Sequence, residues 1–257
     1  MIRIEFLGTG TSHGIPVIGC HCPVCSSEDV HDKRYRSSIL IRKGDTSVVI
    51  DTGYEFRLQA LRSGLDKLDA VLYTHSHSDH LMGLDDLRVF TDERKLPVYS
   101  FPSVLSSIER IFPYAFTDMP YKGVPRLERK EVAERESFSI GELEFQAIPL
   151  LHGCMRIAGY RFGSVAYFTD VSDILYEENK ESFKGIKTLI IGGLRDKPHW
   201  SHFTFQQAVD NAKLIGAEEV YFTHISHATS HRDIEMRFAP YAHPAYDTLV
   251  LEVDDER

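Results

Sequence analysis

Four side chains that can bind a metal ion or exchange a proton occur within the six residues His75-Ser76-His77-Ser78-Asp79-His80. Imidazole and carboxylate groups are the ligands expected for zinc, manganese or iron. Two such ions about 3.5–4 Å apart activate water for hydrolysis. Three histidines and one aspartate this close together are rare by chance. We therefore interpret the segment as the metal site of a metal-dependent hydrolase rather than as a polar surface loop.

A two-metal site needs further ligands, and the sequence offers three that each follow a predicted strand. They are His152 after strand 143–149, Asp170 after strand 165–169 and His224 after strand 219–223. Taken alone, each of these three residues could equally be a structural residue that binds no metal. Because all three occupy the same kind of position, we expect them to share one site with the histidine segment.

The remaining pattern predicts a single α/β domain over residues 1–257. Apolar, β-branched or alternating runs predict strands, and longer periodic runs predict helices. Residues 113–130 show no clear period, so we expect a loop or insertion beside the site. The order of strands, helices, strands and helices suits two sheets with helices outside. The predicted strands are 2–8, 37–42, 46–50, 69–73, 97–100, two within 137–149, 157–162, 165–169, 187–191, 219–223 and 247–253. The predicted helices are 55–63, 81–91, 103–112 and 204–215.

The composition limits the kinds of partner that the chain is expected to bind. Its formal net charge of -9 argues against a broad basic face for duplex nucleic acid, but it permits a small phosphate ester. No apolar run is long enough to span a membrane, and charges interrupt the first apolar stretch, so we expect no membrane segment and no signal peptide. We expect a cytoplasmic protein, and a homodimer is one arrangement that the sequence leaves open.

Three of the four cysteines form the tight cluster Cys20-x-Cys22-x2-Cys25. This spacing offers three thiolates to one tetrahedral zinc ion. We choose His227 as the fourth ligand, because it follows His224 by three residues and one loop could then serve both metal sites. His21 and His231 are the alternatives, and three buried thiols without metal are another. Cys154 is isolated, and we expect it to be a small buried hydrophobic residue.

The motif His-x-His-x-Asp-His resembles the signature of the metallo-β-lactamase superfamily, and Asp51-Thr52-Gly53, His152, Asp170 and His224 resemble its other motifs in order. The resemblance covers nearly the whole chain and implies an αββα sandwich. By the same resemblance, His75, His77 and His152 would hold one metal ion. Asp79, His80 and His224 would hold the other, and Asp170 would bridge the two. An aspartate at the bridging position is typical of the phosphodiesterase and ribonuclease branches.

Two further segments resemble the phosphoribosyl 1,2-cyclic phosphate phosphodiesterases of phosphonate catabolism. They are the run from Gly8 to Pro16 with the cluster from Cys20 to Cys25, and the run Thr223-His224-Ile225-Ser226-His227. The resemblance implies two divalent ions in the active site, either zinc or manganese with iron as an alternative, and one structural zinc ion. It also implies that His202 is catalytic without binding metal, as proton donor or as stabiliser of charge on phosphorus. Asp79 would serve as both ligand and catalytic carboxylate.

Other residues and functions stay open at this point. His13 lies in a glycine-rich turn and is a candidate for substrate contact, and Arg36, Arg195 and His199 are weaker candidates for phosphate contacts. The preferred function is hydrolysis of a cyclic phosphate ester of a sugar or nucleotide. One alternative is another nucleotidyl phosphodiesterase, such as a transfer-RNA 3′-processing endonuclease. Another, of a different class, is a non-catalytic metal-binding carrier of cofactor biosynthesis.

Overall fold

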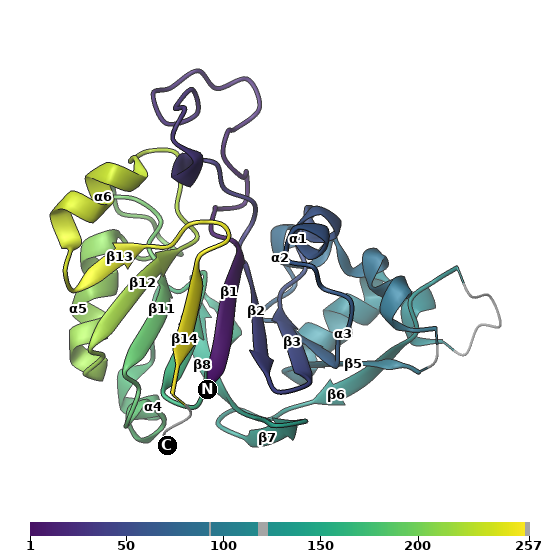
Figure 1. The fold of residues 1–257 in the computed structure, drawn as a ribbon. Helices are drawn as coiled ribbons and strands as arrows, with labels where there is room; N and C mark the ends of the chain where they lie inside the picture. The colour runs from purple at the N-terminus through teal and green to yellow at the C-terminus, as the bar shows by residue number, and fades with distance from the viewer. Residues whose placement is uncertain (93, 118–122, 255–257) are drawn as a thin grey trace.

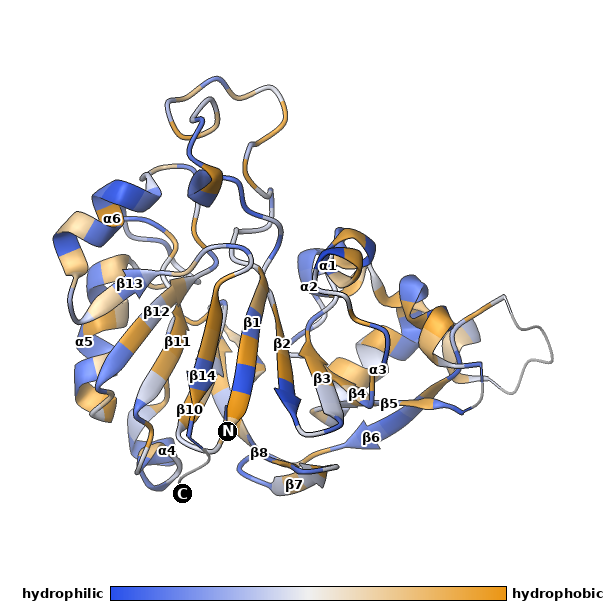
Figure 2. Ribbon diagram, in the orientation of Figure 1, coloured by the Kyte–Doolittle hydropathy of each residue, from blue (hydrophilic) through white to orange (hydrophobic). Residues whose placement is uncertain are grey.

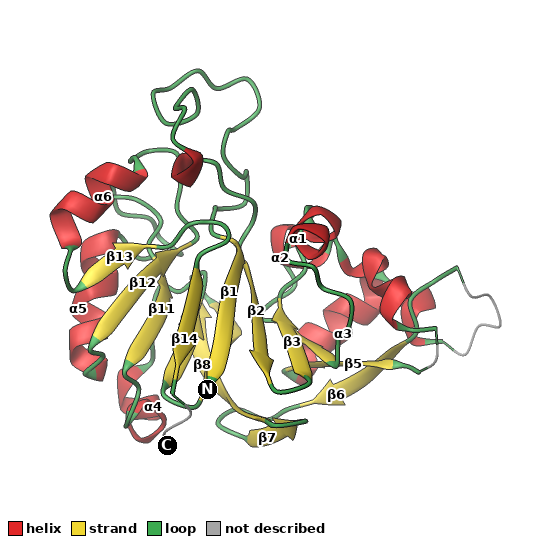
Figure 3. Cartoon of the chain, viewed as in Figure 1, coloured by secondary structure: helices red, strands yellow, loops and turns green. Residues whose placement is uncertain are grey.

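We describe residues 1–92, 94–117 and 123–254 of the chain in a computed structural model. These residues form two seven-stranded mixed sheets that face each other (Figures 1 and 3). In spatial order the first sheet contains β14(Val250–Val253), β1(Ile2–Gly8), β2(Ser38–Lys43), β3(Thr46–Ile50), β4(Ala70–Leu72), β5(Leu96–Ser100) and β6(Leu127–Glu131). The second contains β13(Ala242–Pro244), β12(Glu219–Thr223), β11(Thr188–Gly192), β10(Val165–Phe168), β9(Met155–Phe162), β8(Leu143–His152) and β7(Ser137–Ile140).

Helices cover the outer face of each sheet (Figure 1). On the first sheet these are α1(Phe56–Arg62), α2(Ser78–Leu81), α3(Pro102–Ile111) and the 3-10 helices η2(Leu84–Phe90) and η3(Pro113–Phe116). On the second they are α4(Tyr176–Phe183), α5(Phe205–Ile215) and α6(His231–Phe238). The 3-10 helix η1(Val30–Asp32) lies in the long connection between β1 and β2. The layers are therefore helix, sheet, sheet and helix, which confirms the αββα architecture expected from the sequence.

Alternating side chains of the second sheet pack into two different cores. In β10, Val165 and Tyr167 belong to the cluster between the sheets, while Ala166 and Phe168 belong to the cluster beneath the helices. Successive side chains of a strand point to opposite faces, so a run of apolar residues can serve both layers. Strands β10 and β11 are accordingly apolar along much of their length, whereas the edge strand β6 is largely hydrophilic (Figure 2).

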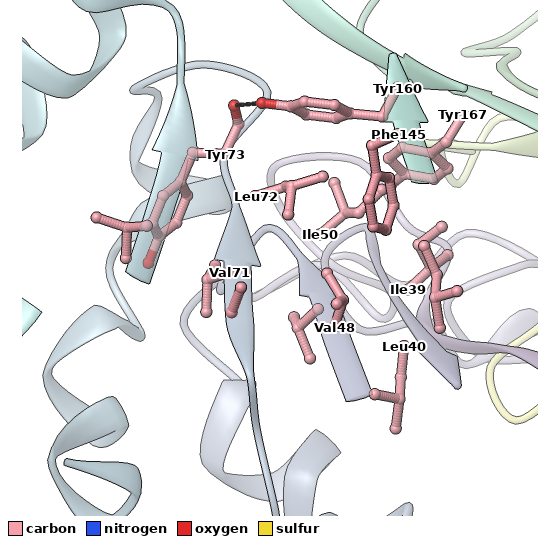
Figure 4. Packing of buried hydrophobic residues seen from close by; sticks show 14 of the residues in the cluster. Ile39, Leu40, Val48, Ile50, Val71, Leu72, Tyr73, Phe145, Tyr160 and Tyr167 are labelled. Carbon is pink, nitrogen blue, oxygen red and sulfur yellow. Dashed lines mark hydrogen bonds between the residues drawn. The ribbon is translucent and has the colours of Figure 1, made fainter. Parts of the chain in front are cut away.

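The hydrophobic cluster between the two sheets also holds the chain in place near the histidine segment. Tyr160 donates a hydrogen bond of 2.8 Å from its buried hydroxyl to the carbonyl oxygen of Tyr73, across the two sheets (Figure 4). Ser100 donates a second one of 2.6 Å to the same oxygen. Buried polar groups are costly without partners, so these bonds fix the end of β4 where the histidine segment begins.

Each sheet has a parallel half, and this topology positions the site. The pairs β3–β4 and β10–β11–β12 run parallel. Carboxyl ends of parallel strands lie at one edge of their sheet. The residues that follow β3 and β4 therefore lie at one edge of the first sheet, and those that follow β10 and β12 lie at one edge of the second.

Several expectations from the sequence need correction. The helix predicted over 81–91 is instead the short α2, which begins at Ser78, followed by η2. Part of the loop predicted over 113–130 is strand β6, while 118–122 lie outside the described residues. Helices α4 and α6 were not predicted. Cys154 is exposed in the turn between β8 and β9, so its predicted burial was wrong. No helix in the described ranges is long and apolar enough to cross a membrane.

Candidate metal centre

The loop after β4 turns at once into α2, and this short connection gathers the histidine segment. His75 is fully buried, and His77 is the exposed residue that precedes the first turn of α2. Asp79 and His80 lie within α2 and are buried. One turn of helix thus places both side chains on the same side as His75, whose ring centroid lies 4.4 Å from that of His80.

The structure brings the seven predicted ligands together in two adjoining groups. His75, His77 and His152 form the first group. Asp79, His80, Asp170 and His224 form the second. Within each group the candidate ligand atoms all lie within 4.8 Å of one another. The division into two groups is the one that the resemblance implied.

Asp170 lies between the two groups. Its Oδ2 is 3.9 Å from His75 Nε2 in the first group. Its Oδ1 is 3.2 Å from His80 Nε2 and 2.9 Å from His224 Nδ1 in the second. One carboxylate oxygen therefore faces each group, which is the geometry that a bridging ligand needs.

The donor atoms that face the centre fit a metal ion. Among the residues that the structure describes, no partner of hydrogen-bond geometry faces His75 Nε2, His80 Nε2 or His224 Nδ1, although all three are buried. Orphaned buried nitrogens are costly unless something binds them. A divalent ion placed among these nitrogens and the carboxylates would satisfy both, so the residues fit the group that the sequence implies.

Four of the histidines also have their second ring nitrogen held by the protein. A metal-binding histidine usually donates this N–H to a carboxylate, hydroxyl or carbonyl group, which fixes its tautomer and ring orientation. The partners are Thr74 Oγ1 for His75 (2.9 Å), Asp51 Oδ2 for His80 (2.7 Å), Ser201 O for His152 (2.8 Å) and Thr11 Oγ1 for His224 (3.1 Å). These supporting residues were not predicted as such. The motif around Asp51 was the one available signal.

Asp51 is the centre of this support. It is fully buried, and it accepts hydrogen bonds from Thr74 N (2.8 Å) and Thr74 Oγ1 (2.7 Å) in addition to His80. Asp51, Asp170 and His224 all have positive φ angles, of 63°, 52° and 56°. This left-handed conformation is uncommon outside glycine and costs about 1–3 kcal/mol where it is imposed. Three strained residues at strand ends in one centre indicate a functional constraint.

The charges of the centre depend on one another. Burial lowers the pKa of His75 well below its usual value, and the nearby His80 adds to this effect. Burial also opposes the charged form of His80, but the carboxylates of Asp170, Asp79 and Asp51 raise its pKa well above the usual value. The charges of His224 and, next, His80 lower the pKa of Asp170 well below its usual value despite its burial. A buried cluster with this much carboxylate favours positive charge at its centre.

His202 lies against the ligands of both groups. Its ring centroid is 4.6 Å from that of His152 and 4.9 Å from that of His224. Burial, followed by the charge of His224, lowers the pKa of His202 to about 3. His152, Asp170 and His202 also approach closely enough to form a metal-binding group of their own. The position of His202 beside the reaction centre was thus predicted, while its role stays a prediction.

The weaker candidates for substrate or phosphate contact differ in what they contact. His13 is exposed, and it is Thr11, two residues earlier, that contacts a predicted ligand. Arg36 pairs with Glu55, donates to Ser12 O at 3.0 Å and lies over the Tyr54 ring, so its contacts are those of a structural residue. Arg195 donates from Nε to the carbonyl oxygen of Lys197 at 3.1 Å.

The cysteine cluster forms a second candidate metal site. The sulfur atoms of Cys20, Cys22 and Cys25 each lie 3.4 Å from His227 Nδ1. His227 is therefore the histidine that faces the three thiols, whereas His231 packs against His31. A hydrogen bond from Cys25 N lowers the pKa of Cys22 to about 6, which favours the thiolate that binds metal, whereas burial raises the pKa of Cys25 to about 11.

The chain belongs to the metallo-β-lactamase superfamily of metal-dependent hydrolases, because the family model of the beta-lactamase superfamily domain matches residues 46–225. It is similar to a solved structure described as a new diphosphatase from the PhnP family, with 37% identity and a TM-score of 0.91 over 99% of this chain and 98% of that one. It is also similar in fold to zinc-bound PqqB from Methylobacterium extorquens, with 20% identity and a TM-score of 0.78 over 98% and 100%.

The curated relatives are longer proteins. The chain is 43% identical to an octanoyltransferase of Porphyromonas gingivalis, over 99% of this chain and 52% of that protein. The chain spans about half the length of the first curated relatives that it matches.

Proposed function

We propose that the chain is a two-metal phosphodiesterase that hydrolyses a cyclic phosphate ester of a sugar or nucleotide. The observation that carries the proposal is the position of Asp170, with one carboxylate oxygen towards His75 and the other towards His80 and His224. The resemblance to a PhnP-family diphosphatase supports the same class of phosphate chemistry. Metal ions bound by the two groups would polarise phosphoryl oxygens and lower the pKa of water.

The residues of the chain have separable roles in this proposal. His75, His77 and His152 would hold one ion, Asp79, His80 and His224 would hold the other, and Asp170 would join the two sets. Asp51 keeps the proton of His80 on Nδ1, so that Nε2 remains a ligand atom. His202, beside both sets, is neutral because its pKa is lowered to about 3, and its ring N–H donates a hydrogen bond to the leaving oxygen or to the developing charge on phosphorus.

Three other functions fit the site less well. A transfer-RNA endonuclease shares the metal residues, but a net charge of -9 is a poor match for a large polyanion. A non-catalytic metal-binding carrier has no need for a complete set of seven ligands, and the likeness to zinc-bound PqqB is one of fold alone. Octanoyl transfer is the activity in the name of a protein of which this chain matches half, and the metal residues account for hydrolysis without it.

The test is turnover by the purified chain supplied with zinc or manganese. The substrates are a ribose cyclic phosphate, a 2′,3′-cyclic nucleotide, bis-p-nitrophenyl phosphate and a precursor transfer RNA. We expect hydrolysis of at least one of the first three. Absence of turnover at verified metal content refutes the proposal, and turnover of the RNA alone favours the endonuclease.

A variant tests the role of His202. We expect His202→Ala to lower kcat roughly 10²-fold or more while its metal content stays that of the wild type. His243→Ala, a histidine that pairs with Glu235 at 2.8 Å on the far end of the second sheet, is the matched control. Retained turnover in His202→Ala with intact metal excludes the catalytic role.

A further inference from the structure

The single tryptophan of the chain is displayed on its surface. Trp200 is 75% exposed, and it lies in the connection between β11 and α5, two residues before His202. A tryptophan side chain offers a large apolar area whose removal from water is favourable. An exposed ring beside a candidate active site is therefore available for stacking against a ligand.

The Trp200 ring packs directly against the backbone of a neighbouring turn. Gly153, in the turn between β8 and β9, has a φ of +61°. A Cβ atom at Gly153 would lie 2.0 Å from Cζ3 of Trp200, so any other residue there would displace the ring. Glycine is thus required twice, for its conformation and for its lack of a side chain. The ring is seated on the turn that directly follows His152.

Trp200 also forms the outer end of a row of aromatic rings. Its centroid is 6.4 Å from that of His199, which is 5.1 Å from that of His202. His202 in turn contacts His152. The segment is tied to the metal residues by the hydrogen bond of 2.8 Å from His152 Nδ1 to Ser201 O. A group attached to a phosphate at the metal residues can therefore extend along this row towards Trp200.

We propose that Trp200 is a stacking platform for a nucleobase, and that the substrates are phosphate esters of nucleosides rather than of base-free sugars. The inference rests on the proposed phosphodiesterase function, because it requires the phosphate to lie at the metal residues. Stacking between a base and an aromatic side chain is strong, and it tolerates any base because each has a π face. The platform would therefore favour substrates that carry a nucleobase over those that carry none, without distinguishing one nucleobase from another.

The fluorescence of the single tryptophan reports on the platform directly. The metal-loaded protein is titrated with adenosine 5′-monophosphate and, separately, with ribose 5-phosphate. We expect saturable quenching by the nucleotide and little change with the sugar phosphate. Equal responses to the two ligands, or no response to the nucleotide, overturn the inference whether or not any substrate is hydrolysed.

Kinetics provide the second test, through the ratio of kcat/KM for 2′,3′-cyclic AMP to that for a ribose cyclic phosphate. We expect Trp200→Ala to lower this ratio roughly 10-fold or more, and Trp200→Phe to retain most of it. Gly153→Ala should lower the ratio with the tryptophan still present, because the ring is displaced. Leu61→Ala, at a residue 65% exposed on α1, is the control.

The outcomes separate the two proposals. If both substrates are hydrolysed and the ratio is unchanged in Trp200→Ala, the platform is wrong and the phosphodiesterase stands. If neither of these nor bis-p-nitrophenyl phosphate is hydrolysed, the phosphodiesterase is wrong and the titration alone decides about Trp200. Sedimentation gives the last comparison. If the wild type self-associates and Trp200→Ala does not, the ring is an interface between copies, and the platform is refuted.

Discussion

Replacing Asp51 with asparagine tests how the protein prepares His80 to bind metal. The Asp51 carboxylate accepts from His80 Nδ1 at 2.7 Å, and its remaining contacts are with Thr74. Asparagine has the same shape but presents an amide N–H₂ group in place of one oxygen. This group needs an acceptor, so it favours the His80 tautomer with the proton on Nε2. Nε2 is the atom of His80 that faces Asp79 and Asp170. A proton on it would occupy the lone pair that a metal ion needs.

The expected magnitude follows from the hydrogen bond between Asp51 and His80 that the substitution removes. A hydrogen bond to a charged group contributes about 1.5–3 kcal/mol to stability. Replacement of a group that supports a metal-binding histidine typically lowers metal affinity by about 10- to 100-fold. We therefore expect Asp51→Asn to bind the metal ion of the second group about 10- to 100-fold more weakly. Because burial raises the pKa of Asp51, part of the loss in metal-free stability is offset when the charge is removed.

The assay is competition with a chelator of known affinity, with the metal content measured at each free-metal concentration. Asp210→Asn is the matched control, because Asp210 is exposed on α5, where it accepts a hydrogen bond from Gln206. Thermal unfolding of both metal-free variants separates loss of fold from loss of affinity. An Asp51→Asn protein that binds metal as tightly as Asp210→Asn refutes the argument about the tautomer.

Three further predictions concern the cysteine cluster, the pH dependence and the core. His227→Ala should lose one zinc equivalent by mass spectrometry of metals, whereas His21→Ala should not; the reverse result would place the fourth ligand at His21. Burial, then the charge of Arg34, lowers the pKa of His231 to about 4. Between pH 6.5 and 4 the unfolded chain binds a proton there that the folded chain does not, so stability falls with falling pH. His231→Gln should flatten this slope in urea unfolding, and an unchanged slope contradicts the assignment. Leu72→Ala, at a fully buried residue of β4, should lower the free energy of unfolding by about 2–5 kcal/mol, and a loss under about 1 kcal/mol would show that the core closes around the gap.

Much of the fold was predictable because buried strands carry a strong local signal. Runs such as Thr46–Ile50 are apolar, β-branched and bounded by turn residues, and they form strands in the structure. The polar sequence of α4, Tyr176–Phe183, has no apolar period and was missed, because its helix depends on a few contacts such as those of Phe183. Cys154 was misjudged because burial is set by the turn that contains it, which no local pattern of a lone cysteine reveals.

The ligands outside the histidine segment could be found because His152, Asp170 and His224 each lie at the end of a strand or just after it, and strand ends can be read from the sequence. The supporting residues could not be found in this way. Thr11 and His224 lie 213 residues apart along the chain, and no local pattern links a threonine to a distant histidine. The strained φ angles of Asp51 and Asp170 were equally invisible, because the surrounding sheets impose them.

The cysteine cluster has a consequence for the unfolded chain. Cys20 and His227 are separated by 207 residues, so an ion held by both closes a loop through most of the sequence. A cross-link of this length removes conformational freedom from the unfolded ensemble worth roughly 5 kcal/mol in the chain-entropy picture. Unlike a disulfide, this restraint would depend on the free zinc concentration. The resistance of the whole domain to unfolding would then vary with zinc supply, even under conditions where catalysis did not.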